Sequence, residues 1–101
     1  MTTIPSTIDV IGRKYQVEYD DSLKGLLGVC DSDGLKISIL PGQVKAMELD
    51  TLLHEVVHAI EIAMLLNMTE RQVYCVTVGL LAVLKNNPHF LEYLNKAINN
   101  E

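Results

Sequence analysis

The segment Asp50 to Val73 constrains the fold of this chain more than any other, because it places polar groups inside an apolar helical pattern. Its sequence, DTLLHEVVHAIEIAMLLNMTERQV, repeats apolar residues with the period of a helix that packs on a core. His54, Glu55 and His58 interrupt that pattern. Burying two imidazoles and a carboxylate without partners is costly. A bound metal ion would remove much of that cost.

The spacing within HEVVH matches the geometry of a zinc site. His54 and His58 lie on the same helix face, about one turn apart, so both rings can reach one tetrahedral ion. Glu55 lies about 100° around the helix from His54. There it can act as a general base on a zinc-bound water without binding the metal. The motif therefore predicts His54 and His58 as zinc ligands and Glu55 as the catalytic base. The alternative is a helical interaction protein that binds no metal, in which the two histidines occur at this spacing by chance.

Composition excludes several other classes of function. With 101 residues, 49% of them hydrophobic, the chain predicts a single globular domain spanning residues 1–101. The net charge is −5 and the basic residues are scattered, which argues against nucleic-acid binding. The longest apolar run, Val73 to Leu84, is too short to span a membrane. The N-terminus lacks the pattern of a signal peptide, so we expect a cytoplasmic protein with Cys30 and Cys75 as free thiols.

The first part of the chain predicts a small β-sheet, with its strands within residues 8–40. Apolar residues alternate with polar ones from Ile8 to Tyr19, as in strands with one buried face. The turn signal DSDG at Asp31 to Gly34 divides Leu27 to Leu40 into a predicted hairpin. Pro41-Gly42 then ends the strand.

From about residue 44 the apolar period becomes helical. The predicted helices span residues 44–66, 69–86 and 88–98. Thr69 and Gln72 form a capping box at the start of the second helix, and Pro88 suits the first turn of the third. Strands followed by helices indicate an α+β domain, with helices packed on one sheet.

Taken together, TLLHEVVHAIE, MTERQVYCVTVGLLAVLKNNP and the upstream LGVCDSDGLKISIL resemble the small zincin-like metallopeptidases often encoded by bacteriophages and prophages. HExxH is the sharp motif, and the remaining similarity is one of pattern. The resemblance implies a minimal zincin domain that hydrolyses peptide bonds with Zn²⁺. It also implies a third, acidic metal ligand from the second helix, and a peptide or protein substrate that lies extended beside the strand Leu35 to Leu40.

The identity of the third metal ligand is less clear from the sequence than that of the two histidines. The candidates are Glu61, Glu70, Tyr74 and His89. Glu61 shares the histidine face but lies about 10 Å along the helix from His54, which favours a supporting role. Glu70 matches the acid that the resemblance implies, and we predict it as the ligand. It can reach the metal only if the first helix ends early, near Ala63.

Position 74 would suit a ligand better if the two helices were joined by a tight turn. It is occupied by Tyr74, which could be a weak ligand or could stabilise an oxyanion. His89 follows a proline beyond the second helix and is expected at the surface. The tyrosine leaves open a second hypothesis, a catalytically inactive zincin scaffold that acts as a binding or regulatory module. Substrate specificity and oligomeric state are not predicted.

Overall fold

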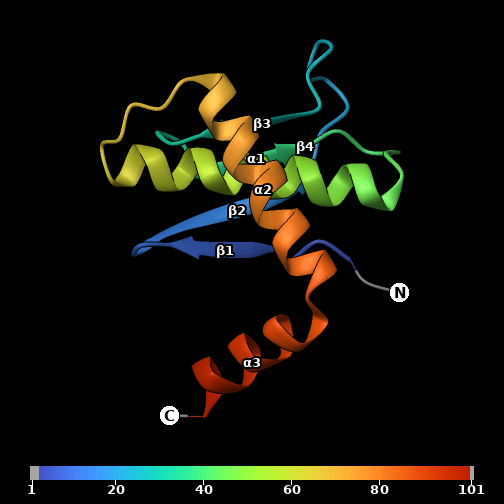
Figure 1. Cartoon of the computed structure of the whole chain (residues 1–101). Coiled ribbons are helices and arrows are strands. Elements are labelled where there is room, and N and C mark those ends of the chain that lie inside the picture. Colours follow the sequence, from blue (N-terminus) through green and yellow to red (C-terminus); the bar gives the residue numbers. More distant parts are fainter. Residues whose placement is uncertain (1–2, 101) are drawn as a thin grey trace.

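The computed structural model describes residues 3–100 and shows an α+β domain, as the sequence predicts (Figure 1). Four strands come first and three helices follow. The strands are β1 (Thr7–Val10), β2 (Arg13–Tyr19), β3 (Gly28–Asp31) and β4 (Lys36–Ile39), and the helices are α1 (Lys45–Ala63), α2 (Glu70–Asn86) and α3 (Pro88–Asn99).

The strands form one mixed sheet in the order β1-β2-β4-β3. β1 pairs antiparallel with β2, and β3 with β4 forms the predicted hairpin. β2 and β4 are parallel, with Val17 opposite Ile37 and Tyr19 opposite Ile39. β4 is therefore paired on both sides, and the expectation that substrate adds to the strand Leu35 to Leu40 is wrong, because the backbone groups of β4 already pair with β2 and β3. The free edge beside α1 belongs to β3.

The core lies between the sheet and α1. The inward side chains of β2 and β4 alternate with outward polar ones, and Ile37 and Ile39 are fully buried. Ala59 is the residue of α1 that joins this cluster. The buried cluster consists of Val10, Tyr15, Val17, Ile37, Ile39 and Ala59. α1 packs on β1, β3 and β4. This packing fixes the position of His54 and His58 relative to the edge strand β3.

The helices stack outward from the sheet. α1 lies across one face of the sheet, and α2 crosses α1 on the side away from it (Figure 1). Within residues 3–100, α2 packs only against α1 and α3, and α3 packs only against α2. In the same part of the chain, the helices are too short or too polar to cross a membrane.

The helix boundaries match the prediction closely, with one consequential difference. The predicted capping box is confirmed, because the Thr69 hydroxyl accepts the Gln72 N–H and the Gln72 side chain accepts the Thr69 N–H. The first helix was expected to continue to residue 66, but α1 ends at Ala63. Leu65 and Asn67 have positive φ angles of 56° and 52°, which cannot continue a right-handed helix.

Candidate metal centre

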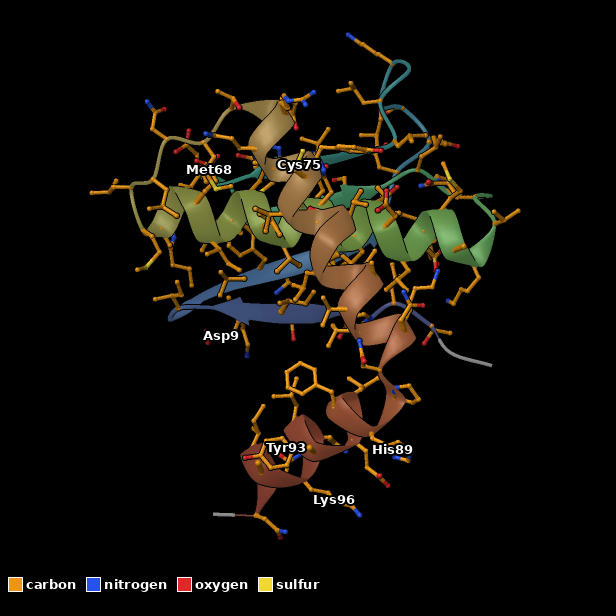
Figure 2. The ribbon with its side chains drawn as sticks, in the orientation of Figure 1. Asp9, Met68, Cys75, His89, Tyr93 and Lys96 are labelled. Carbon is orange, nitrogen blue, oxygen red and sulfur yellow. The ribbon has the colours of Figure 1, made fainter. Side chains whose placement is uncertain are left out.

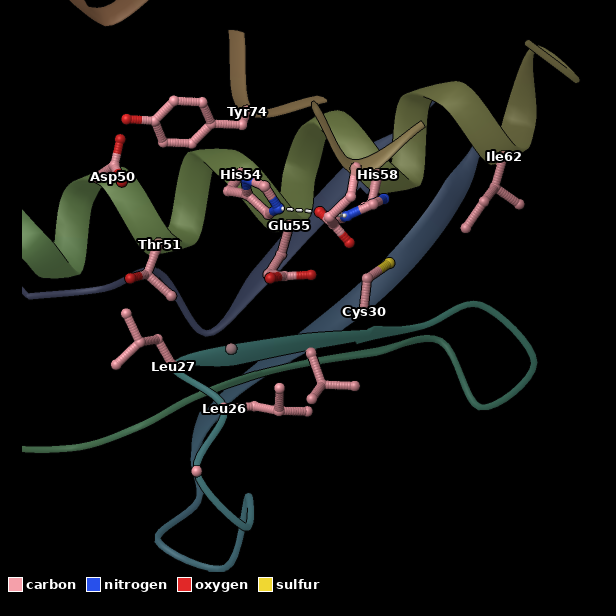
Figure 3. A pocket seen from close by; sticks show the side chains of 14 residues that line it. Leu26, Leu27, Cys30, Asp50, Thr51, His54, Glu55, His58, Ile62 and Tyr74 are labelled. Carbon is pink, nitrogen blue, oxygen red and sulfur yellow. Dashed lines mark hydrogen bonds and ion pairs between the residues drawn. The ribbon is translucent and has the colours of Figure 1, made fainter. Parts of the chain in front are cut away.

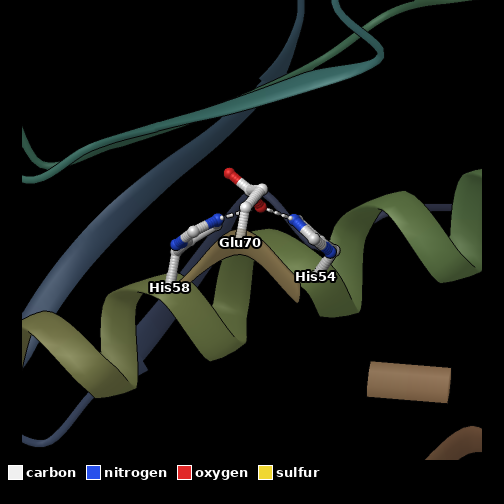
Figure 4. Close-up of side chains that lie close together, drawn as sticks. All are labelled: His54, His58 and Glu70. Carbon is white, nitrogen blue, oxygen red and sulfur yellow. Dashed lines mark hydrogen bonds and ion pairs between the residues drawn. The ribbon is translucent and has the colours of Figure 1, made fainter. Parts of the chain in front are cut away.

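The site is centred on three side chains from two helices. His54 and His58 project from successive turns of α1, with ring centroids 4.9 Å apart. The Glu70 carboxylate at the start of α2 lies between them (Figure 4). Glu70 Oε1 is 2.7 Å from His54 Nε2 and 2.9 Å from His58 Nε2. One oxygen and two imidazole nitrogens therefore converge within 4.8 Å of one another.

Glu70 reaches the histidines because the connection between the helices is wide. The early end of α1 at Ala63 leaves six residues, 64–69, before α2 begins. Glu61 Oε1 accepts the backbone N–H of Met68 at 3.0 Å, which ties this connection back to α1. The capping box then fixes the first turn of α2, where Glu70 is the first helical residue. This arrangement meets the condition on which the prediction of Glu70 depended.

Glu61 also contacts the second nitrogen of His58. Its Oε2 lies 3.3 Å from His58 Nδ1, on the opposite side of the ring from Glu70. A neutral imidazole can donate from only one nitrogen. With carboxylates at both nitrogens, His58 is satisfied either as a cation or with Nδ1–H donated to Glu61 and Nε2 directed to a metal ion. The latter pattern is the usual support for a metal-bound histidine, so the donor set fits zinc.

The charges of the cluster reflect the same contacts. Burial alone would lower the pKa of His58, but the bonds to Glu70 and Glu61 outweigh it and raise the pKa overall. The bond from His58, with a further bond from His54, lowers the pKa of Glu70. The lowered pKa of Glu70 favours the carboxylate form, which is the form that a metal ligand requires.

Glu55 lies behind this cluster, at the base of a groove. It is 6% exposed, and burial raises its pKa above the usual value for a glutamate, against the opposing effect of His58 and His54. Gly28 of β3 passes directly beneath it. A Cβ atom at Gly28 would lie 3.2 Å from Glu55 Oε2 and 2.7 Å from Thr51 Cγ2. Only glycine lets β3 approach α1 this closely.

The groove runs between α1 and the free edge of β3 and has a volume of about 670 Å³ (Figure 3). His54, Glu55, His58 and Glu70 line it together. Its opposite wall is formed by the segment 25–30, which includes Leu26 and Leu27. The polar cluster therefore opens onto a largely apolar groove, beside a strand edge that has no partner within the described residues.

The remaining ligand candidates are placed differently. Tyr74 is 57% exposed on the rim of the groove, and its ring extends toward Asp50 (Figure 3). His89 lies on α3, far from the connection at Met68 (Figure 2), and its side chain is fully exposed. Two further features of the site, Gly28 and the free edge of β3, were not predicted from the sequence. Both depend on which strand lies beside α1.

Comparison of the chain with family models, with curated proteins and with solved structures finds no match. The geometry of the site is therefore the basis for inferring a function.

Proposed function

We propose that this protein is a zinc-dependent peptidase of the zincin-like type. The observation that carries the proposal is the convergence of His54 Nε2, His58 Nε2 and Glu70 Oε1 beside the buried carboxylate of Glu55. Two imidazoles and one carboxylate form a donor set that zinc enzymes use, with the fourth position left to water or substrate. The HExxH motif that predicts His54 and His58 as metal ligands also predicts Glu55 as the catalytic base.

The reaction follows from the positions of these groups. A zinc ion held by the three side chains would lower the pKa of a bound water and polarise the scissile carbonyl. Glu55 accepts a proton from the attacking water as its oxygen bonds to the carbonyl carbon. The same carboxyl group then donates that proton to the departing amine, as the C–N bond breaks. Burial of Glu55 favours this role, because it brings the pKa of the carboxyl group closer to neutrality.

The groove indicates how a peptide would bind. Leu40 N–H donates to Leu27 O across the hairpin, and in an antiparallel pair such bonds occur at every second residue. The backbone groups of Gly28 and Cys30 therefore face away from β4, toward the groove. An extended peptide added to this edge would pass beneath the metal cluster. The proposed substrate strand thus pairs with β3 rather than with β4.

Metal content tests the first part of the proposal. Protein purified without chelator is analysed for zinc by mass spectrometry, as wild type, His54→Ala and His89→Ala. We expect about one zinc per chain in the wild type and in His89→Ala, whose histidine is fully exposed on α3. We expect loss of zinc in His54→Ala. A wild type that binds no zinc at micromolar free concentration contradicts the proposal.

A second variant separates binding from catalysis. Glu55→Gln removes the base but none of the three converging donor atoms. We expect it to retain zinc and to lose hydrolysis of unfolded protein or a peptide library by at least about 10²-fold, whereas Glu92→Gln on α3 has no effect. Hydrolysis that survives in Glu55→Gln would exclude Glu55 as the base. Zinc binding without hydrolysis in the wild type would favour the inactive scaffold instead.

A further inference from the structure

The surface of α2 is unusual for a helix at the outside of a domain. From Gln72 to Leu84 its sequence contains no charged residue. Within the described chain, however, only Val73 and Thr77 of this helix are buried, both toward α1. A helix that is apolar on all sides is normally covered on all sides. α2 therefore lacks a partner on its outer side.

The uncovered surface is the outer face of α2, about 180° around the helix from Val73 and Thr77. It is the outermost layer of the molecule, on the far side of α1 from the sheet (Figure 1). Its valines are 40–47% exposed. Small residues lie along its centre and larger ones along its sides. The face consists of Cys75, Val76, Val78, Gly79, Ala82 and Val83.

Gly79 at the centre of this face is not explained by contacts within the chain. A glycine in the interior of a helix costs about 1 kcal/mol relative to alanine. A Cβ atom at Gly79 would have no atom within 4 Å among the described residues, and the residue does not have a positive φ. Its small size serves a purpose if another helix approaches closely at this point.

The exposed area is also larger than a monomer of this size should have. The chain exposes 7073 Å², whereas a monomeric protein of 11.2 kDa exposes about 5,700 Å². The excess of about 1,400 Å² is more than the roughly 800 Å² per partner that a standard interface buries. α3 contributes to it, since it projects from the end of α2 (Figure 1) with Phe90, Leu91, Tyr93 and Ile98 45–71% exposed.

We propose that the outer face of α2, together with the exposed apolar side chains of α3, is the interface of a homodimer, in which α2 packs on α2 of a second copy near Gly79. A permanently apolar surface needs a partner at matching concentration, which a second copy always supplies. The face has no charge with which to select a different protein. Because this face carries no charged side chain, two chains that each have a net charge of −5 can associate there without direct repulsion between like charges.

The mass in solution tests the proposal directly. We expect sedimentation equilibrium at micromolar concentration to give twice the chain mass of 11.2 kDa, with or without zinc. A single-chain mass up to about 100 µM overturns the proposal. A monomer that binds neutral phosphatidylcholine vesicles would also overturn it, and would assign the surface to lipid.

Two substitutions locate the interface. In a monomer, Gly79→Leu enters open space and raises the melting temperature, because leucine is the better helix former. In the proposed dimer, the new side chain separates the helices and raises the dissociation constant at least about 30-fold. Val83→Lys is expected to do the same, while Met47→Lys, at a similarly exposed position on α1, leaves the dimer intact. Circular dichroism shows that each variant is folded. A dimer that persists in both α2 variants contradicts this interface.

Discussion

At the scale of a single residue, Glu61 links the two parts of the metal centre, which are the histidines of α1 and the connection that leads to Glu70. One carboxylate oxygen contacts His58 Nδ1 and the other accepts the Met68 N–H, two residues before Glu70. Glu61→Gln keeps the shape of the side chain, but its amide can provide an acceptor to only one of these two groups. We therefore expect the zinc dissociation constant to rise about 10–100-fold, as measured by competition with a chromophoric chelator. Glu92→Gln is the matched control, and equal affinities in the two variants would contradict this role.

Gly28 sets the distance between the β3 edge and the catalytic helix. In Gly28→Ala the new methyl group would meet Thr51 Cγ2 at 2.7 Å, so β3 or α1 must move. We expect a loss of about 1–3 kcal/mol in the free energy of unfolding, measured in urea. Thr51→Ser removes Cγ2 but keeps the hydroxyl that donates to Gln43. The double variant should recover part of the lost stability, and no recovery would mean that the contact with Thr51 is not the cause.

The residues of the site differ in how far the sequence could predict them. His54, Glu55 and His58 follow from local periodicity, because all three lie within five consecutive residues of one helix, which fixes their relative positions. The place of Glu70 depends on where α1 ends, which is decided by the backbone at Leu65 and by a bond from Glu61. Such contacts cannot be derived from helix propensity, which would have continued α1 through residues 64–66.

At the scale of the elements, the start of α2 determines whether Glu70 faces the histidines. The Thr69 hydroxyl accepts the Gln72 N–H and so fixes the first turn of the helix. In Thr69→Ala we expect the free energy of unfolding to fall by about 0.5–2 kcal/mol. Zinc affinity should fall as well, because Glu70 then moves with a frayed turn. Thr69→Ser retains the oxygen and should match the wild type in urea denaturation and in zinc titration. Weakened binding in Thr69→Ser would assign the effect to something other than the cap.

The sheet shows why elements are easier to predict than their arrangement. Apart from Thr7, the first residue of β1, the four strands lie within the predicted residues 8–40, and the local hairpin of β3 and β4 is confirmed. The parallel pairing of β2 with β4 joins strands separated by residues 20–35, which include β3, and no local pattern records it. This pairing places β3 at the edge of the sheet. The strand with which we propose that a peptide substrate pairs is therefore β3 and not β4.

At the scale of the whole molecule, the proposed zinc ion would join two helices that otherwise share a narrow contact. His54 and His58 belong to α1 and Glu70 to α2, and only Val73 and Thr77 of α2 are buried within the described chain. Because the three donors come together only in the folded state, zinc should stabilise it by mass action. An excess of about 1,000-fold over the dissociation constant corresponds to roughly 4 kcal/mol.

For a domain of this length, that stabilisation should raise the melting temperature by on the order of 15 °C or more. Differential scanning calorimetry with zinc and with EDTA measures the shift, at fixed protein concentration because a dimer melts in a concentration-dependent way. His58→Ala should abolish the shift, whereas His89→Ala should retain it, since that side chain is fully exposed on α3. Equal melting temperatures with zinc and with EDTA in the wild type would mean that the three donors do not hold the ion between α1 and α2.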